Sequence, residues 1–423
     1  MQTSLTLIVF ALTLLGVFLR PWRLNEAWFT VAGGSAMLVL GLVSSRQASQ
    51  IVYDGREALL FLLGLLVLSD LMRASGFFEW AAIHAARSSR GRGTILYRNI
   101  FILGFLVTAL LSLDTTAVML TPVVLALVGR LKLTARPFLF VCAFVANTGS
   151  LLLPVSNLTN LLFVSAFRWS FGAFTAWMVL PQLFALMANY WLFRRLFASS
   201  LPSSFDVEGL PLPMAPEVVP DVRFFRASVC VFALVVLGYF VGPAVRVPPY
   251  AFAMAGAFAL YVWGLRLGRV SLGLLREVSW PVFPFVIGLF VVVRAMENLG
   301  LATLVSQGLA RGAHSPFLTV VIGVFGTGLG SNVVNNIPMA LLSISSLHTG
   351  NDLSRYAALV GCNLGPNLTV AGSLATMLVI ASARRQGEDV GAKDFFRVGL
   401  VATPLLLSAG CLGLLAVSFF LPR

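Results

Sequence analysis

Asp114 is the residue whose surroundings most suggest chemistry. It is the only charged side chain in a run of 31 residues, from Asn99 to Gly129. An ionised carboxylate is costly to keep in an apolar environment, so an isolated one within a membrane is a functional candidate by default. Such a group can exchange a proton. It can also cap the start of a helix that begins at Thr115, and the two roles are compatible.

Three further clusters of polar residues interrupt apolar segments. They are ANTGS with PVSN (146–150 and 154–157), GTGLGSNVVNNIP (326–338) and CNLGPNLT (362–369). Their glycine, proline and asparagine residues break helices, and within a membrane the freed backbone groups must line a cavity or be buried in protein. Broken helices also direct their ends at small polar solutes. We therefore expect these clusters and SLDTT (112–116) to form one substrate site.

The candidate substrate-binding residues carry amide or hydroxyl groups, and none is basic. They are Thr115, Thr116, Asn147, Thr148, Asn332, Asn335, Asn336, Asn363 and Asn367, with Asp114 as the candidate proton-coupling group. A single asparagine in a membrane helix more often bonds a neighbouring helix, and this is the favoured interpretation of Asn157 and Asn160. The sequence predicts no catalytic residue, metal site or cofactor.

The composition is that of an integral membrane protein. Of the 423 residues, 58% are hydrophobic and 11% are charged, against roughly 25% charged residues in soluble domains. The net charge of +13 comes from Lys and Arg residues between apolar spans, which favours a topology signal over nucleic-acid binding. Cys142, Cys230, Cys362 and Cys411 form no CxxC pair, so no redox or zinc motif is predicted.

Enzymatic functions fit the sequence poorly. An intramembrane serine protease needs a Ser–His pair, and His84, His314 and His348 all fall outside the apolar spans. An intramembrane aspartyl protease needs two mid-membrane aspartates, and only Asp114 qualifies. We therefore expect a transporter rather than an enzyme.

Ten apolar spans are predicted, at about 4–20, 27–44, 57–73, 137–165, 172–197, 226–242, 250–266, 280–296, 356–382 and 398–420. Two uncharged stretches remain, at about 95–130 and 315–348. A straight helix of 31 residues is about 47 Å long and exceeds the ~30 Å hydrocarbon core. We interpret both stretches as re-entrant helical hairpins.

The two halves of the chain resemble each other. FLLGLLVLSDLMRASG (61–76) matches FVIGLFVVVRAMENLG (285–300), and NTGSLLLPVSNL (147–158) matches NLGPNLTVAGSL (363–374). The expected fold is all-α, with two repeats (1–198 and 226–423) joined by a proline-rich cytoplasmic linker (199–225). Each repeat has five spans, a broken fourth span and one hairpin. Because five is odd, the second repeat must be inserted upside down, as in secondary transporters.

The distribution of charge predicts the orientation. With both termini outside, the inner loops contain 21 of the 29 Lys and Arg residues, as the positive-inside rule requires. The expected location is the inner membrane of a bacterial or archaeal cell.

The motifs DTTAVMLTP, NTGSLLLPVSNLTNLL, SNVVNNIP and CNLGPNLTVAGSLAT resemble those of the arsenical pump membrane protein family, the arsenite efflux permeases of the ion transporter superfamily. The resemblance covers essentially the whole chain. It implies export of arsenite and antimonite, driven by the proton-motive force or assisted by a soluble ATPase subunit. Ser331 and Asn332 match the start of the Ser-Asn-Thr signature of dicarboxylate carriers, but Val333 replaces its threonine.

Two alternatives remain at this stage. A sodium/proton antiporter of the same superfamily would need more carboxylates than Asp114 alone supplies for two ions. A channel-like facilitator of neutral hydroxides would transport without a proton gradient. The inverted, broken-helix pattern favours alternating access over a channel.

Overall fold

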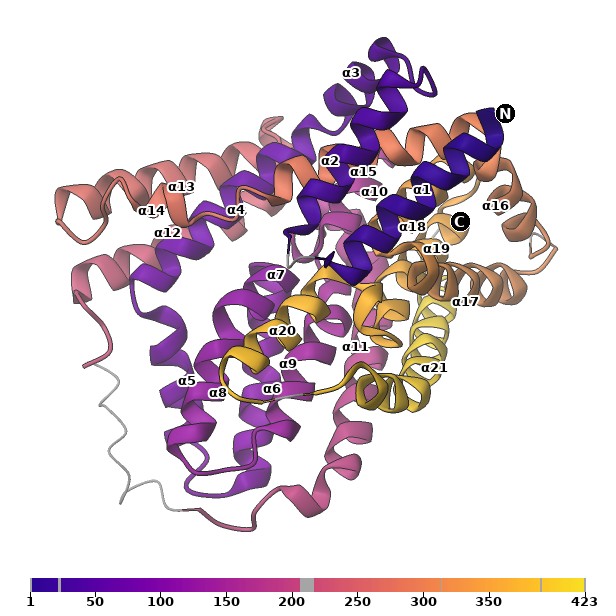
Figure 1. Cartoon of the computed structure of the whole chain (residues 1–423). Coiled ribbons are helices and arrows are strands. Elements are labelled where there is room, and N and C mark those ends of the chain that lie inside the picture. Colours follow the sequence, from indigo (N-terminus) through magenta and orange to yellow (C-terminus); the bar gives the residue numbers. More distant parts are fainter. Residues whose placement is uncertain (1, 22–23, 206–216, 313, 389, 422–423) are drawn as a thin grey trace.

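The computed structural model describes residues 2–21, 24–205, 217–312, 314–388 and 390–421, and these residues form helices and their connections (Figure 1). The helices of the first half are α1 (Gln2–Leu19), α2 (Glu26–Val39), α3 (Ser45–Asp54), α4 (Arg56–Ala74), α5 (Phe77–Arg87), α6 (Gly93–Leu110), α7 (Leu113–Thr115), α8 (Thr121–Arg130), α9 (Arg136–Thr148), α10 (Leu158–Phe167) and α11 (Phe171–Leu196). Those of the second half are α12 (Val222–Val245), α13 (Pro249–Arg266), α14 (Leu274–Glu277), α15 (Val282–Asn298), α16 (Leu301–Ala310), α17 (Pro316–Val334), α18 (Asn336–Ser346), α19 (Asp352–Leu364), α20 (Leu374–Arg385) and α21 (Ala392–Val417).

Within the described residues, eight helices are long and apolar enough to cross a membrane, or nine if the bent pair α4–α5 counts as one span. Each predicted span falls on one helix or on a pair of short ones. The sequence analysis missed α3, α5, α14 and α16, which are short or continue a span after a turn. The expected linker also ends earlier than residue 225, because α12 begins at Val222, and its residues 206–216 lie outside the described residues.

Four interruptions occur within the predicted hairpins and broken spans. The first hairpin turns at Leu111 and Ser112, and the second turns at Asn335, whose φ of 76° lies in the left-handed region. The α9–α10 and α19–α20 pairs are interrupted at 149–157 and 365–373, each by two short 3₁₀ turns. A π-helical turn joins α7 to α8 immediately before Pro122, which has no N–H to donate to the preceding turn.

The order of elements is the same in both halves. Each half has two helices, a short helix, a long helix bent into a shorter one, a hairpin, a broken pair and a final long helix. Helices of opposite halves pack together, with α2 against α15, α4 against α13 and α11 against α21 (Figure 1). Glycine permits the first contact, because a Cβ on Gly288 would lie 2.5 Å from the backbone carbonyl of Thr30 on α2.

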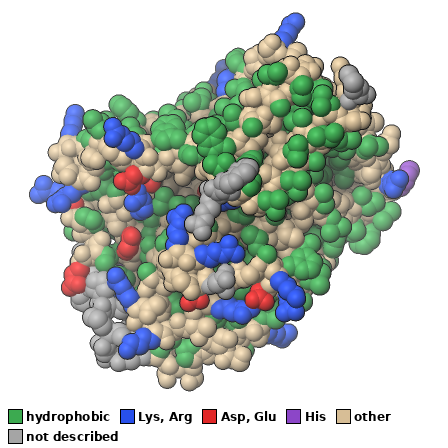
Figure 2. Space-filling model, in the orientation of Figure 1, with side chains coloured by type: hydrophobic (Ala, Val, Ile, Leu, Met, Phe, Trp, Pro, Cys, Tyr) green, Lys and Arg blue, Asp and Glu red, His purple; other side chains and the backbone are tan. Residues whose placement is uncertain are grey.

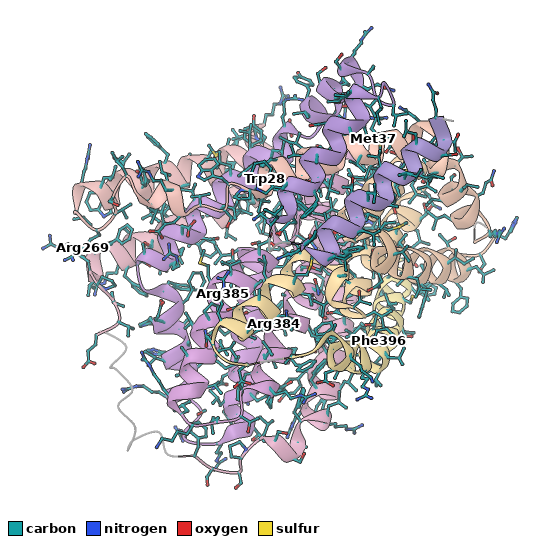
Figure 3. All side chains as sticks on the ribbon, viewed as in Figure 1. Trp28, Met37, Arg269, Arg384, Arg385 and Phe396 are labelled. Atoms are coloured by element: carbon teal, nitrogen blue, oxygen red, sulfur yellow. The ribbon has the colours of Figure 1, made fainter. Side chains whose placement is uncertain are left out.

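The surface of the molecule agrees with a membrane location. Hydrophobic side chains cover much of the face shown in Figure 2, and the basic side chains on that face lie mostly in its lower part and along its edges. Trp28 and Met37 lie on the same helix, α2, yet Trp28 is 66% exposed and Met37 is fully buried (Figure 3). One face of α2 therefore packs on the protein, while the other is available to lipid.

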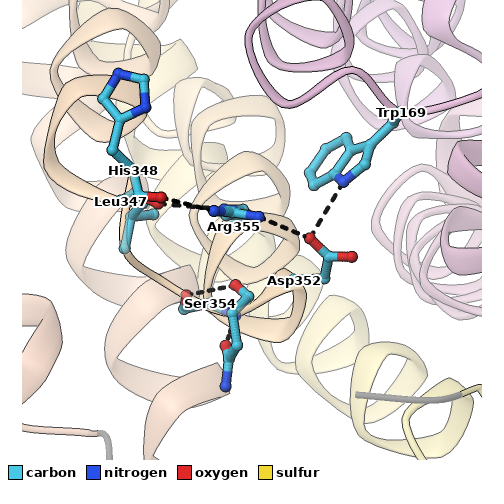
Figure 4. A network of polar contacts seen from close by, with 7 residues as sticks. Trp169, Leu347, His348, Asp352, Ser354 and Arg355 are labelled. Atoms are coloured by element: carbon cyan, nitrogen blue, oxygen red, sulfur yellow. Dashed lines mark hydrogen bonds and ion pairs between the residues drawn. The ribbon is translucent and has the colours of Figure 1, made fainter.

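A polar and aromatic network joins the loop after α10 to the start of α19 (Figure 4). The Nε1 atom of Trp169 donates to Oδ1 of Asp352 at 3.2 Å, and Arg355 donates to the same oxygen at 3.0 Å. The indole of Trp169 also stacks on Tyr356, with ring centroids 4.0 Å apart. Arg355 further donates to the carbonyls of Leu347 and His348 after α18. The network ties elements of both halves together at one end of the broken pairs.

Candidate functional site

A small cavity lies where four helices begin. Its volume is about 20 Å³, which is room for about one ordered water molecule. The first residues of these helices line it, namely Leu113 and Asp114, Asn157 and Leu158, Asn336 and Ile337, and Ser373 and Leu374, together with Leu62 of α4 and Val282, Phe285 and Val286 of α15. Both hairpin turns and both interruptions therefore meet at one cavity, which includes residues of both halves.

The positive ends of four helix dipoles converge on this cavity. The helix from Leu113 to Arg130 has 18 residues, α10 has 10, α18 has 11 and α20 has 12. The start of a helix presents backbone N–H groups and a partial positive charge. Ser112, Asn157 and Asn335 each accept a hydrogen bond from the first turn of their own helix, whereas Ser373 makes no such cap bond.

Three polar groups of the cavity have no partner among the described residues. Asp114 is the only charged residue of the lining, and no hydrogen bond or ion pair is found for its carboxylate. Asn336 and Ser373 are 4% and 1% exposed, and the Oδ1 atom of Asn336 and the Oγ atom of Ser373 are buried without partners. All three groups can accept a hydrogen bond. They are free to bind a small polar solute.

A family model described as arsenical pump membrane protein matches residues 5–417 of the chain. The chain belongs to the arsenical pump membrane protein family. The arsenical pump membrane proteins of Yersinia enterocolitica and of Escherichia coli strain K12 are each 31% identical to it, over 93% of this chain and 94% of theirs. A putative arsenical pump membrane protein of Bacillus subtilis is 25% identical, over 96% of this chain and 98% of its own.

The fold is similar to that of a solved transporter. The crystal structure of the YdaH transporter of Alcanivorax borkumensis, described as having an unusual topology, matches with a TM-score of 0.59 at 14% identity. The match covers 90% of this chain and 91% of that one. The chain is therefore a multi-pass membrane transporter of the arsenical pump family, and its all-helical fold has a structural relative among transporters.

Several predicted site residues bond to one another rather than face the cavity. The Nδ2 atom of Asn147 donates to Oγ1 of Thr376 at 2.9 Å and to Oδ1 of Asn367 at 3.3 Å. Asn367 in turn donates to Oγ1 of Thr148 at 3.3 Å. These bonds connect α9 to α20 and to the interruption after α19. Asn147, Thr148 and Asn367 are thus brought together, but they do not line the cavity.

A second network contains Asn363. Its Nδ2 atom donates to Oδ1 of Asn160 at 2.6 Å, and its Oδ1 atom accepts from Thr159 at 2.6 Å and from Asn157 at 3.1 Å. The helix–helix role expected for Asn157 and Asn160 is therefore observed. Asn157 has a second role as well, because it also lines the cavity.

The threonines of the first hairpin are not among the residues that line the cavity. The hydroxyl of Thr115 lies 2.9 Å from that of Ser69 on α4 and 3.0 Å from that of Ser112, and the hydroxyl of Thr116 lies 2.7 Å from that of Thr108 on α6. These bonds fix the turn that presents Asp114.

The amides of the second hairpin attach it to the interruption between α19 and α20. Asn332 donates to the carbonyl of Gly365 at 2.8 Å and accepts from Thr369 at 2.9 Å, while Asn335 donates to the carbonyl of Ala371 at 3.1 Å. Asn336 is the residue of this group that lines the cavity. The role of the other predicted residues in binding substrate stays a prediction.

Ser373 is a polar lining residue that was not predicted from the sequence. A serine at the end of an apolar segment carries little signal alone. The internal match contains the signal, because NTGSLLLPVSNL over NLGPNLTVAGSL places Ser373 opposite Asn157. Both residues are N-caps, of α20 and α10, with nearly the same extended backbone.

Proposed function

We propose that the chain exports arsenite and antimonite by alternating access coupled to proton influx, with Asp114 as the proton-coupling group. The observation that carries this proposal is the cavity at which both hairpin turns and both interruptions meet around one carboxylate. Family membership supports arsenical transport. The cavity supports a site at which proton and substrate compete.

The chemistry of the cavity suits a neutral trihydroxide. Arsenite at neutral pH is uncharged and has three hydroxyl groups, each of which can donate a hydrogen bond. The carboxylate of Asp114, Oδ1 of Asn336 and Oγ of Ser373 are three acceptors without partners among the described residues. A proton on Asp114 would weaken the strongest of these acceptors, because a neutral carboxyl group accepts hydrogen bonds less strongly than a carboxylate. Protonation would therefore favour release of the substrate.

The substrate requires movement of the surrounding elements. A cavity with room for about one water molecule is smaller than arsenite, so the four helix starts must separate for the substrate to enter. Leu62, Val282 and Phe285 complete the lining and belong to the long helices α4 and α15. We infer that these two helices form the stationary wall and that the hairpins and broken pairs move against it.

The arrangement of the helices supports two inverted repeats, residues 1–198 and 226–423, joined by a cytoplasmic linker. The same order of elements occurs twice, and the cavity takes corresponding residues from each half. We propose that both hairpins are re-entrant, that both termini face outside and that the chain lies in the inner membrane. A soluble ATPase partner is a separate expectation from the family resemblance.

Survival of an arsenite-sensitive host without its own efflux system tests the function. Expression of the chain should restore growth on arsenite and on antimonite and should lower the arsenic content of the cells. Energised everted vesicles should accumulate arsenite, and an uncoupler should abolish the accumulation. Uncoupler-insensitive movement would instead indicate a channel-like facilitator. Sodium-dependent proton movement without any effect of arsenite would indicate a sodium/proton antiporter.

A further inference from the structure

Besides exchanging a proton, Asp114 affects which charge a ligand of the cavity can carry. Starts of helices are ready-made anion sites, because their N–H groups and dipoles both favour negative charge. Four of them meet here, and the lining contains no basic side chain. The buried hydroxyl of Ser373, which has no partner among the described residues and can donate a hydrogen bond to an anion, also belongs to the lining. Apart from Asp114, the cavity therefore has the features of an oxyanion site.

We propose that the Asp114 carboxylate is the selectivity group that excludes oxyanions such as phosphate and arsenate while admitting the neutral trihydroxide. The inference rests on the proposed function and extends it to the substrate class. When it is ionised, the carboxylate places the protein's own negative charge in the positive field of the four helix starts. An incoming anion would stand beside a like charge in a small, enclosed space, which is strongly unfavourable. A neutral ligand meets no such repulsion, and its hydroxyl groups can donate hydrogen bonds to the carboxylate.

The position of Asp114 explains how one group serves the whole cavity. Asp114 lies in the first turn of its own helix. Because the cavity is small, Asp114 is also close to the starts of the other three helices. The corresponding turn of the second hairpin supplies the uncharged amide of Asn336. The discrimination therefore comes from one half of the chain alone, and a single substitution should remove it.

The test is ligand-dependent thermal stabilisation of the purified protein in detergent at neutral pH, with inorganic arsenate, phosphate and arsenite as probes. The wild-type protein should be stabilised by arsenite and not by arsenate or phosphate. The Asp114→Asn variant keeps the size of the side chain and adds an N–H donor. It should gain saturable stabilisation by arsenate and phosphate, with apparent affinity higher by about tenfold or more, as expected when a like charge is removed.

A matched control is Asp54→Asn, which removes an exposed carboxylate at the end of α3 and should leave every response as in the wild type. Adding Ser373→Ala to Asp114→Asn should weaken the new arsenate response, because Ser373 lines the same cavity. This double variant shows that the anion binds in the cavity and not on the basic surface.

The outcomes separate the two proposals. If the wild type binds arsenate as well as the Asp114→Asn variant does, or if the folded variant binds arsenite but gains no arsenate response, the selectivity role is overturned while the proposed function stands. If neither the wild type nor the folded variant responds to arsenite, the protein does not bind arsenite and the proposed function fails. A gain of arsenate response that Ser373→Ala leaves unchanged also overturns the selectivity role.

Discussion

The amide nitrogen of Asn363 lies 2.6 Å from the side-chain oxygen of Asn160, so that α19 of the second half is joined to α10 of the first. The reciprocal bond runs from Asn147 on α9 to Thr376 on α20, at 2.9 Å. Each broken pair is thus held by an asparagine of the other. The arrangement couples the two interruptions, and both contribute residues to the cavity.

We expect Asn363→Ala to act first on stability. The substitution leaves Oδ1 of Asn160 and Oγ1 of Thr159 buried without a partner, at a cost of about 1–3 kcal/mol for an unsatisfied group. The unfolding temperature in detergent should fall. The control is Asn298→Ala, which removes an exposed asparagine that donates to the carbonyl of Leu42. It should lower the unfolding temperature less. Normal stability together with loss of arsenite binding would instead assign Asn363 to the substrate.

Ser373→Ala should weaken transport without weakening the fold. The Oγ atom of Ser373 has no partner, so its removal breaks no internal bond but withdraws one acceptor from the substrate. A single hydrogen bond contributes about 0.5–1.5 kcal/mol, so the KM for arsenite should rise by up to about tenfold. Ser228→Ala on α12 also removes a buried serine hydroxyl, far along the chain from the cavity lining, and its KM should not change. An unaltered KM for Ser373→Ala would remove this serine from the site.

Gly288→Ala should separate α2 from α15. The added Cβ would lie 2.5 Å from the backbone of Thr30, and a backbone atom cannot rotate away. Overpacking of this kind costs about 1–3 kcal/mol, which a fall in the unfolding temperature would reveal. Gly326→Ala on α17 is the matched control, since nothing lies within 4 Å of its added Cβ. Equal effects of the two substitutions would contradict the close contact.

Asp221 gives a prediction about pH. Its carboxylate accepts hydrogen bonds from the N–H groups of Phe224 and Arg223 at the start of α12 and pairs with Arg269 at 3.2 Å. These contacts hold the pKa of Asp221 below its ordinary value of 3.8, and the hydrogen bond from the N–H group of Phe224 has the largest effect. A carboxyl group whose pKa is lower in the folded state stabilises the protein above the unfolded pKa, and this contribution is lost as the pH falls through the folded pKa.

The unfolding temperature of Asp221→Ala should therefore be lower than that of the wild type at neutral pH, and the difference should shrink below about pH 4. Asp221→Asn keeps a capping side chain without the charge, so its stability should show no titration from this position. A difference between wild type and Asp221→Ala that is constant from pH 7 to pH 3 would exclude the titration of Asp221 as its cause.

Much of the fold follows from the sequence because apolar length and helix-breaking residues are local signals. The predicted spans coincide with helices, and the hairpin turns fall at Ser112 and Asn335, within the clusters singled out. The short helices α5 and α16 were missed, because each follows a left-handed glycine, Gly76 or Gly300, and the α4–α5 pair bends by 61°. A bend of this kind depends on tertiary packing and leaves no periodic signal.

The site was harder to predict than the fold. Composition identifies residues that can bond a polar solute, but it does not say which of them are already satisfied by each other. Asn363 and Asn367 have the expected chemistry, yet their bonds are internal. Asn147 also donates internally, and only its Oδ1 atom is buried without a partner among the described residues. Asp114 could be predicted because no other charged residue lies near it in the sequence. Ser373 was found only in the lining of the cavity, and its one sequence signal is its correspondence with Asn157.

The most direct test of the account measures proton movement in proteoliposomes that contain purified protein and a pH-sensitive dye. Adding arsenite to the wild-type vesicles should produce a proton flux in the opposite direction. With Asp114→Asn, the arsenite-induced proton flux should vanish, while exchange of arsenite across the membrane continues. A full arsenite-dependent proton flux in Asp114→Asn would contradict the central claim that Asp114 couples the proton to the substrate.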